Sequence, residues 1–291
     1  MDDYGSIVIS TPMIRVAGSN SLPEPNTISL SNHFVCFIDL LGVKKNIDNM
    51  DGLEKIYRAL RIYKKIKSSY SEDPFIGVRI VSDDNKLLSQ MEINLPYQCS
   101  FFSDSLIISY KHEKPRPDYA ELYCILYDIN MLVFVLLMNG IFVRGGLSYG
   151  KLYHDGDICF GQALVEAVYL ESNIAIYPRV VISPNIFDDT SDAHPFKTIK
   201  TNNKTLQHLH NYAIATDKTG TEPIIWGDYL DHLLLNPAQA SIIGKNIINE
   251  LNQPHPERVM KKYLWMKEYF NGQLSRTDAL HKEARVLEIV N

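Results

Sequence analysis

Hydrophobic positions along the chain follow two different periods, and their alternation divides the sequence into strands and helices. The continuous apolar run at 34–41 predicts a buried strand, whereas apolar residues three and four apart over 51–66 predict an amphipathic helix. The later patterns predict a polar strand near 75–84, two short apolar stretches around a tight turn at Asp104, a mostly apolar helix over 118–139, a strand over 141–154, a helix from Gly161, a strand over 179–187 and two helices after Pro237.

The order of these elements, β-α-β-β-α-β and onward, is that of a split βαβ arrangement. We therefore expect an α+β, ferredoxin-like fold, with a mostly antiparallel sheet covered by helices and a C-terminal helical extension. Residues 1–30, rich in Ser, Pro, Asn and Gly, are expected to form an N-terminal arm, residues 31–235 the domain that carries the site, and residues 236–291 the helical extension.

Composition limits the classes of function. The 291 residues are 45% hydrophobic with a net charge of −5, which fits a globular protein and gives no overall basic field for coating nucleic acid. The longest apolar run, "MLVFVLLM", is far shorter than the roughly 20 residues that cross a bilayer. The four Cys form no motif and the sequence starts without a signal-peptide pattern, so we expect a cytoplasmic protein with no nucleic-acid partner and no membrane span.

Asp39 interrupts the apolar strand "FVCFIDLLGVKK". A lone buried carboxylate is costly unless it is paired, hydrogen-bonded or bound to a metal. Asp104 lies at the turn of the expected hairpin, which neighbours the first strand in a split βαβ sheet, so the two carboxylates can converge. Paired acids without His or Cys suit Mg²⁺ or Mn²⁺. The alternative is that Asp39 caps the next helix and Asp104 is an ordinary turn residue, and spacing alone leaves both open.

Three segments in combination resemble the class III nucleotide cyclases. "FIDLLGV" is similar to the first-strand motif of that family, "FFSDSLII" to its hairpin motif, and "VRGGLSYGKLYHDGDICFGQALVEAVYLES" to its strand, turn and helix ending in Leu-Glu-Ser. The likeness covers residues 33–185 and rests on the order of all three motifs. It implies two divalent cations, Mn²⁺ or Mg²⁺, held by Asp39, the backbone carbonyl of Leu40 and Asp104. It also implies attack of a ribose 3′-hydroxyl on the α-phosphate with loss of pyrophosphate.

The sequence departs from the purine cyclases at two sets of residues. Val165 and Tyr169 stand where the family carries the Asn and Arg that stabilise the transition state. Ser100 replaces the Lys that helps to read adenine, and Ile158 replaces its partner acid, with Asp157 one residue off. A site with its metals retained and these sets replaced resembles the pyrimidine cyclases of the Pycsar anti-phage systems, which make cyclic UMP or cyclic CMP. The resemblance therefore implies that UTP, and secondarily CTP, is the substrate, and that a separate effector responds to the product.

The loop after Asp39 is the expected cradle of the triphosphate. The backbone N–H groups of Gly42, Val43 and Lys44 can face phosphate at the positive end of the following helix, and Lys44 adds a cation. The alternative is that Lys44 is an ordinary solvent-exposed residue at the start of a helix.

Four further residues are assigned to substrate binding: Phe37 and Ser100, Arg144 beside two glycines, and Tyr169 with its hydroxyl and ring. A small pyrimidine could be read by Ser100 together with nearby backbone and water. For Arg144 the sequence favours a structural salt bridge over phosphate binding. For Tyr169, packing in an interface is an equal alternative to contact with ribose or base.

Two classes of function remain open. The first is a homodimeric pyrimidine cyclase with sites built from both protomers, in which the helix bearing Val165 and Tyr169 faces the partner's Asp39. The second is a cyclase-fold module without catalysis that serves as a nucleotide-sensing or scaffolding dimer. Replacement of the Asn and Arg favours the second, whereas retention of both acids favours the first. A purine cyclase is third, disfavoured by Ser100 and Ile158.

Overall fold

The computed structural model describes residues 29–42, 50–72, 75–81, 87–94, 97–112, 120–156, 158–187, 214–217, 224–230 and 237–276. The predictions for Val43, for Lys44, for Asp157 and for the arm up to residue 28 lie outside the described residues. Within the described ranges, no helix is both long and apolar enough to span a membrane.

The elements are, in chain order, β1 (Ser31–Leu41), α2 (Met50–Glu72), β2 (Phe75–Val81), β3 (Leu87–Asn94), β4 (Tyr97–Phe102), β5 (Ser105–Lys111), α3 (Ala120–Met138), β6 (Phe142–Asp155), β7 (Ile158–Phe160), α4 (Gln162–Tyr169), the π-helical turn η1 (Leu170–Ile174), β8 (Val180–Ile182), the 3₁₀ turn η2 (Pro184–Ile186), β9 (Ile214–Asp217), β10 (Ile224–Gly227), α6 (Pro237–Leu251) and α7 (Glu257–Arg276).

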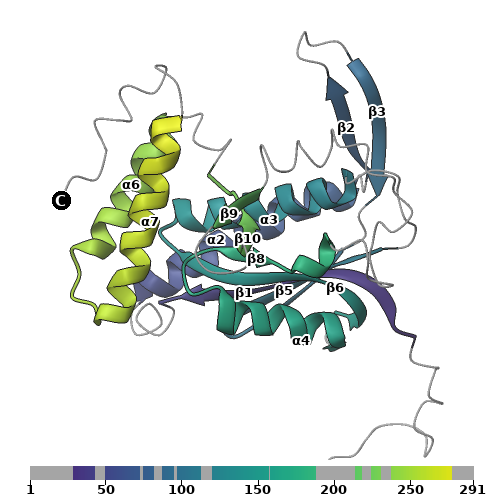
Figure 1. The fold of residues 1–291 in the computed structure, drawn as a ribbon, viewed down its shortest axis with the longest axis horizontal. Helices are drawn as coiled ribbons and strands as arrows, with labels where there is room; N and C mark the ends of the chain where they lie inside the picture. The colour runs from purple at the N-terminus through teal and green to yellow at the C-terminus, as the bar shows by residue number, and fades with distance from the viewer. Residues whose placement is uncertain are drawn as a thin grey trace, which may run out of the picture.

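One sheet organises the molecule, with strand order β4-β5-β1-β6-β8-β10-β9 and β7 paired to β6. Neighbouring strands in this sheet run antiparallel, except for β6 and β8, which are parallel. Helices cover it on both faces, with α3 over one face and α4 over the other (Figure 1). The expected α+β class, with a mostly antiparallel sheet covered by helices, is confirmed.

The first strand is apolar from Phe34 to Ile38, and again at Leu40 and Leu41 after Asp39, because both of its faces are covered. Phe34, Cys36 and Ile38 belong to the main core, which they form with residues of α3, while Val35 belongs to a smaller core with α4. Side chains two residues apart share a face of a strand, so Asp39 continues the face of Val35 toward the end of α4. The acid therefore lies at the margin of the smaller core and outside the main one.

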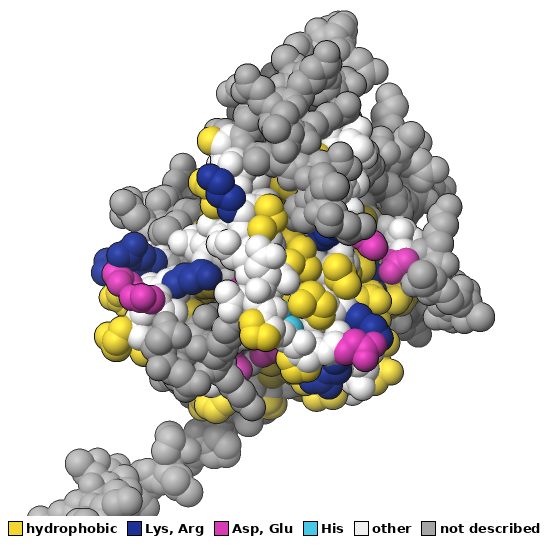
Figure 2. Space-filling view, turned by 90° about the vertical axis from the view of Figure 1, so that its left-hand side faces the viewer, with side chains coloured by type: hydrophobic (Ala, Val, Ile, Leu, Met, Phe, Trp, Pro, Cys, Tyr) yellow, Lys and Arg dark blue, Asp and Glu magenta, His cyan; other side chains and the backbone are white. Residues whose placement is uncertain are grey.

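The expected helical extension is present as α6 and α7, which lie at the end of the sheet where β1 ends (Figure 1). Tyr263 of α7 packs edge-on against Phe142 of β6, with ring centroids 5.1 Å apart. Figure 2 views the molecule from this end and shows charged side chains of both signs around a group of hydrophobic ones. The two helices thus belong to the same packed body as the sheet.

The strand expected near 75–84 is β2, but its partner was not predicted. It pairs with β3 in a two-stranded ribbon separate from the main sheet, and this ribbon projects from the body in Figure 1. The hairpin that carries Asp104 is formed by β4 and β5, as expected.

Candidate active site at the end of β1

Asp39 lies near the end of β1, between the two strands that pair with it. Its Cα partners are Ser105 of β5 and Arg144 of β6. Asp104 occupies the β4–β5 turn, and its backbone oxygen accepts a hydrogen bond of 2.9 Å from the Leu40 N–H. The turn also contains Ser103 with φ +54°, a left-handed conformation that is uncommon for a residue other than glycine. The two acids thus lie at the same end of the sheet, and the turn is tied to β1 by a backbone hydrogen bond.

The environment of Asp39 disfavours its charged form. Burial raises the pKa of this carboxyl above its ordinary range, while the hydrogen bond and the charge of Arg144 act in the opposite direction. The negative charge of Asp104 raises the pKa further. A cation placed between the two acids would relieve that repulsion.

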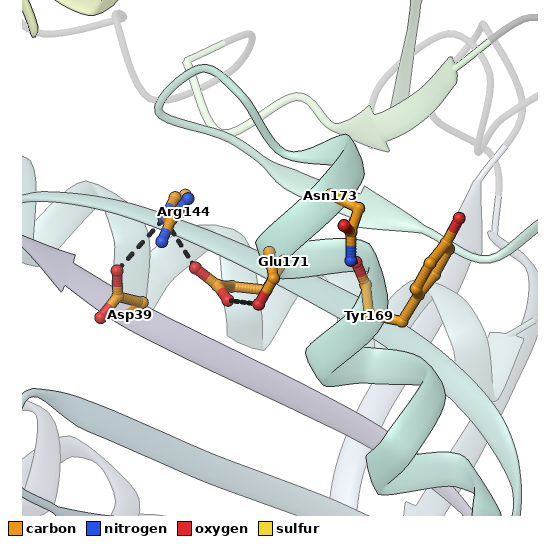
Figure 3. Close-up of polar contacts among 6 residues, drawn as sticks. Asp39, Arg144, Tyr169, Glu171 and Asn173 are labelled. Carbon is orange, nitrogen blue, oxygen red and sulfur yellow. Dashed lines mark hydrogen bonds and ion pairs between the residues drawn. The ribbon is translucent and has the colours of Figure 1, made fainter.

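Arg144 connects Asp39 to a buried glutamate. Its Nε donates a hydrogen bond of 3.2 Å to Asp39 Oδ2 and forms an ion pair of 2.6 Å with Glu171 Oε1 (Figure 3). Glu171 is only 4% exposed, and its other oxygen accepts a hydrogen bond of 2.7 Å from the Ser172 hydroxyl. The salt bridge that the sequence favoured for Arg144 is therefore present, and it lies within the site.

A π-helical turn gives Glu171 its direction. After α4 ends at Tyr169, η1 continues the helix with a wider turn, closed by the hydrogen bond from the Ala175 N–H to the Leu170 carbonyl. Figure 3 shows Glu171 pointing toward Arg144 and Tyr169 pointing away from it. Such π-turns are rare and frequently occur at functional sites.

The carboxylate pair fits a divalent cation. Two acids close enough to repel each other, with a backbone carbonyl at Leu40 between them in sequence, supply the oxygen donors that Mg²⁺ and Mn²⁺ prefer, leaving phosphate and water to complete the coordination. No group of three or more His, Cys, Asp or Glu within the described ranges could hold a metal by itself. Asp39, Leu40 and Asp104 are therefore the residues that would hold such ions.

The expected base-reading residue, Ser100, lies on the same face of the sheet as Asp39. The register aligns Ser100 with Ile107 of β5, which in turn pairs with Phe37 of β1. Phe37 packs with the smaller core beneath α4. On this face of the sheet, Phe37 lies two residues before Asp39 on β1, and Ser100 lies on β4, with Ile107 of β5 between them.

The Ser100 hydroxyl already takes part in a hydrogen-bond network. It donates to the Gly156 carbonyl, and its oxygen lies 2.7 Å from Nε2 of His154, whose Nδ1 is 2.7 Å from the Ser109 hydroxyl. Burial lowers the pKa of His154, which favours the neutral ring. Because the serine proton is used by Gly156, Nε2 donates to Ser100 and Nδ1 accepts from Ser109. Ser100 thus has an oxygen lone pair, rather than a proton, to offer a ligand.

The helix positions that differ from the purine cyclases face outward. Val165 is 70% exposed and Tyr169 is 56% exposed, and both line an open hollow on the surface of α4 together with Gly161, Gln162 and Glu166. Figure 3 places the Tyr169 ring on the far side of the helix from Arg144. Within one protomer the structure therefore does not bring Tyr169 to Asp39.

Of the loop that follows Asp39, Gly42 is described, with φ +78° in the left-handed region that glycine adopts readily.

Two contributors to the site were not predicted. Glu171 belongs to the "LES" segment, but its role as the ion partner of Arg144 was missed. Lys262 of α7 is half-buried, and its charge acts on both Asp39 and Glu171. Two features of the sequence could have indicated them. For Glu171 it was the position of an acid directly after an apolar helix, and for Lys262 it was the basic stretch "ERVMKKY" in the C-terminal extension.

Comparisons with known proteins find solved structures that match at low identity and with low TM-scores. No protein-family model matches the chain, and no curated protein matches it. Among solved structures, the adenylyl cyclase CyaB from P. aeruginosa is 13% identical, with 68% of this chain and 94% of that chain covered and a TM-score of 0.39. A bacterial light-regulated adenylyl cyclase is 12% identical, with 83% and 57% covered and a TM-score of 0.40. The guanylyl cyclase Cya2 is 12% identical, with 68% and 92% covered and a TM-score of 0.30.

Proposed function

We propose that this chain is a nucleotide cyclase that converts UTP, and secondarily CTP, to the 3′,5′-cyclic monophosphate and pyrophosphate. The observation that carries the proposal is the pairing of Asp39 and Asp104 at one end of the sheet, with Arg144 beside them. The three motifs that resemble class III cyclases provide these residues, in the expected order.

The site residues divide the work between holding cations and placing phosphate. Asp39, the Leu40 carbonyl and Asp104 would hold the divalent cations, which would supply activation of the 3′-hydroxyl and neutralisation of the charge on the leaving group. Arg144 lies within 3.2 Å of Asp39, where its guanidinium can orient the phosphates. Glu171 holds Arg144 in place, since it pairs with the same Nε at 2.6 Å. Most of the protein's contribution is therefore positioning.

The preference for a pyrimidine rests on the polar groups that are missing from the base pocket. With Ser100 in place of a lysine and Ile158 in place of an acid, a purine edge has no matching partners, and an unpaired polar edge is strongly disfavoured. The Ser100 lone pair and nearby water suit an N–H of a smaller base. The proposed biological role is synthesis of a second messenger for a separate effector in bacterial anti-phage defence, as the resemblance implies.

A homodimer is proposed because apolar side chains are exposed on the α4 side of the sheet. Val165 is 70% exposed, and Ile158 and Tyr169 are each 56% exposed. Facing a second copy, these residues would be covered, and Tyr169 would approach the partner's Asp39. An active protein that sedimented only as a monomer at assay concentration would refute the composite site.

The second candidate is a cyclase-fold module without catalysis. It is favoured by one observation, the replacement of the transition-state Asn and Arg by Val165 and Tyr169. Such a module would bind nucleotide without forming a cyclic product.

Removal of each acid tests the proposed function. We expect Asp39→Ala and Asp104→Ala each to lower Mn²⁺-dependent turnover of UTP at least about 100-fold while the fold is retained, because each removes a charged group from the reacting centre. Asp155→Ala is the matched control, since Asp155 is an exposed acid at the other end of β6 from Arg144. Near wild-type turnover by either site variant at saturating Mn²⁺ would exclude these acids as metal ligands.

A further inference from the structure

Two basic side chains of α7 have no hydrogen-bond or ion-pair partner among the described residues, and one of them, Lys262, lies near the acids of the site. Arg258 and Lys262 are four residues apart, and so one helical turn apart on the same side of α7. Neither makes a hydrogen bond or an ion pair with any of the described residues, whereas Lys261, next to Lys262, pairs with Glu257 at 2.8 Å. Within the described part of the chain, no salt bridge accounts for their position.

The charges around Lys262 identify its surroundings. Burial lowers the pKa of Lys262, and the positive charges of Arg144 and Arg258 lower it further, while Asp39 and Glu171 act in the opposite direction. Arg144 and Lys262 thus act on the same two acids, Asp39 and Glu171, and Arg258 acts on Lys262. The two nearby acids already pair with Arg144, and Lys262 forms no ion pair with any of the described residues, so it remains a half-buried positive charge. A charge in that situation is stabilised when an anion arrives.

Packing holds α7 in the orientation that places Lys262 there. The adjacent Tyr263 contacts Phe142, which lies two residues before Arg144 on the same strand and therefore on the same face. Further along the helix, Trp265 stacks on Tyr177 with ring centroids 5.3 Å apart. The position of Lys262 beside Arg144 is thus built into the fold.

Buried polar contacts fix the second half of the helix. Tyr269 donates a hydrogen bond to Asp228, and Gln273 donates to the same carboxylate at 2.9 and 3.0 Å. The buried Arg179, paired with Asp217 at 3.1 Å, lies over the rings of Tyr177 and Trp265. A helix held by so many buried groups presents its side chains at fixed points.

We propose that Lys262, supported by Arg258, binds the terminal phosphates of the nucleoside triphosphate, so that the C-terminal helix completes the substrate site of its own protomer. The inference rests on the proposed function. Asp39, Asp104 and Glu171 would repel a free triphosphate, and Arg144 is already paired to two of them. A second cation near these acids offsets that repulsion and directs the leaving phosphates toward α7.

Binding of inorganic tripolyphosphate to the full chain tests the proposal without any need for turnover. The informative variant is Lys262→Met, which retains the aliphatic stem and removes the charge, and Lys261→Met is the matched control on the exposed side of the same turn. We expect Lys262→Met to weaken tripolyphosphate binding in calorimetry about 10-fold, as befits loss of a charged hydrogen bond, and the control to change it less than about 2-fold. Lys262→Arg should retain most of the affinity.

A purely structural role of Lys262 would give a different pattern. It would leave tripolyphosphate affinity unchanged, or change it in proportion to a loss of stability in urea denaturation. Arg258→Gln keeps the inference testable if Lys262→Met fails to fold, because Arg258 is exposed and its replacement should not disturb the fold. This variant should weaken tripolyphosphate binding about 2- to 3-fold through loss of a nearby charge. Absence of tripolyphosphate binding to the wild-type chain, or equal binding by Lys262→Met and Lys261→Met, would overturn the inference.

The same proteins separate this inference from the proposed function. If wild-type protein forms no cyclic nucleotide but Lys262→Met weakens tripolyphosphate binding, the phosphate site stands and the cyclase proposal fails. If cyclic nucleotide forms and Lys262→Met leaves the KM for UTP unchanged, the cyclase proposal stands and the inference fails. A rise in KM with kcat nearly unchanged supports both.

Discussion

Glu171→Gln is the most informative single change, because it removes one charge from the site and keeps the shape of the side chain. Glu171 is 4% exposed and lies 2.6 Å from Arg144 Nε. At that distance the attraction is about 6 kcal/mol for an effective dielectric of about 20, before the cost of desolvating both groups is subtracted. Loss of one partner of a fully buried pair costs about 3–5 kcal/mol.

The expected loss is smaller than that of a fully buried pair. The Arg144 side chain is 26% exposed and keeps its hydrogen bond to Asp39, so water and the second acid compensate in part. We expect Glu171→Gln to lower the free energy of unfolding by about 2–3 kcal/mol, which for a chain of this size is a fall in Tm of about 3–5 °C.

Urea denaturation and thermal unfolding measure this change, with Glu257→Gln as the control. Glu257 is 84% exposed and pairs with Lys261 across one helical turn, an arrangement worth about 0.3–0.5 kcal/mol. If Glu171→Gln and Glu257→Gln were equally mild, the ion pair of Arg144 with Glu171 would not organise the site. In that case the π-helical turn η1 would not serve to direct Glu171 toward Arg144.

Two further predictions concern packing and charge. A Cβ at Gly146 would lie 2.7 Å from the Leu170 Cβ, so Gly146→Ala should lower the free energy of unfolding in urea by about 1–3 kcal/mol. The control is Gly272→Ala, whose Cβ meets nothing within 4 Å and which should be neutral or stabilising by up to about 1 kcal/mol. Equal effects of the two substitutions would contradict the close contact of helix and sheet. Because burial, and secondarily Asp104, raise the pKa of Asp39, the folded chain binds that proton more tightly than the unfolded chain and the charged form costs stability at neutral pH. Asp39→Asn should therefore equal or exceed wild type in stability at pH 7, with the difference vanishing below about pH 4, and a clear loss at pH 7 would show that the Arg144 pair outweighs the burial.

The part of the site that could be predicted from the sequence depends on strands and short turns. An acid ending an apolar strand and an acid in a tight hairpin turn can come together when those strands are neighbours, so element order placed Asp39 and Asp104 at the same end of the sheet. Ser100 and Phe37 also fell on the face of Asp39, because alternation along paired strands fixes the face of each residue.

The residues that were missed depend on features that periodicity does not encode. Glu171 turns toward Arg144 because the helix widens to a π-turn at Leu170, and nothing in the apolar spacing of 162–171 announces that change. Lys262 reaches the site from a helix far along the chain, through the packing of Tyr263 on Phe142. The partner of β2 was missed because "LLSQMEIN" has no consistent alternation of apolar and polar residues.

The central claim is that Asp39 and Asp104 serve the cyclisation of a pyrimidine nucleotide. The most direct measurement incubates the purified full chain with equal concentrations of ATP, GTP, CTP and UTP and Mn²⁺, and identifies the products by mass, with Asp104→Ala in parallel. We predict that cyclic UMP predominates, that cyclic CMP is second, and that the variant forms neither. Predominant cyclic AMP or cyclic GMP would contradict the pyrimidine assignment and leave the cyclase standing, whereas no cyclic product at all would contradict the cyclase and favour the catalytically inactive module.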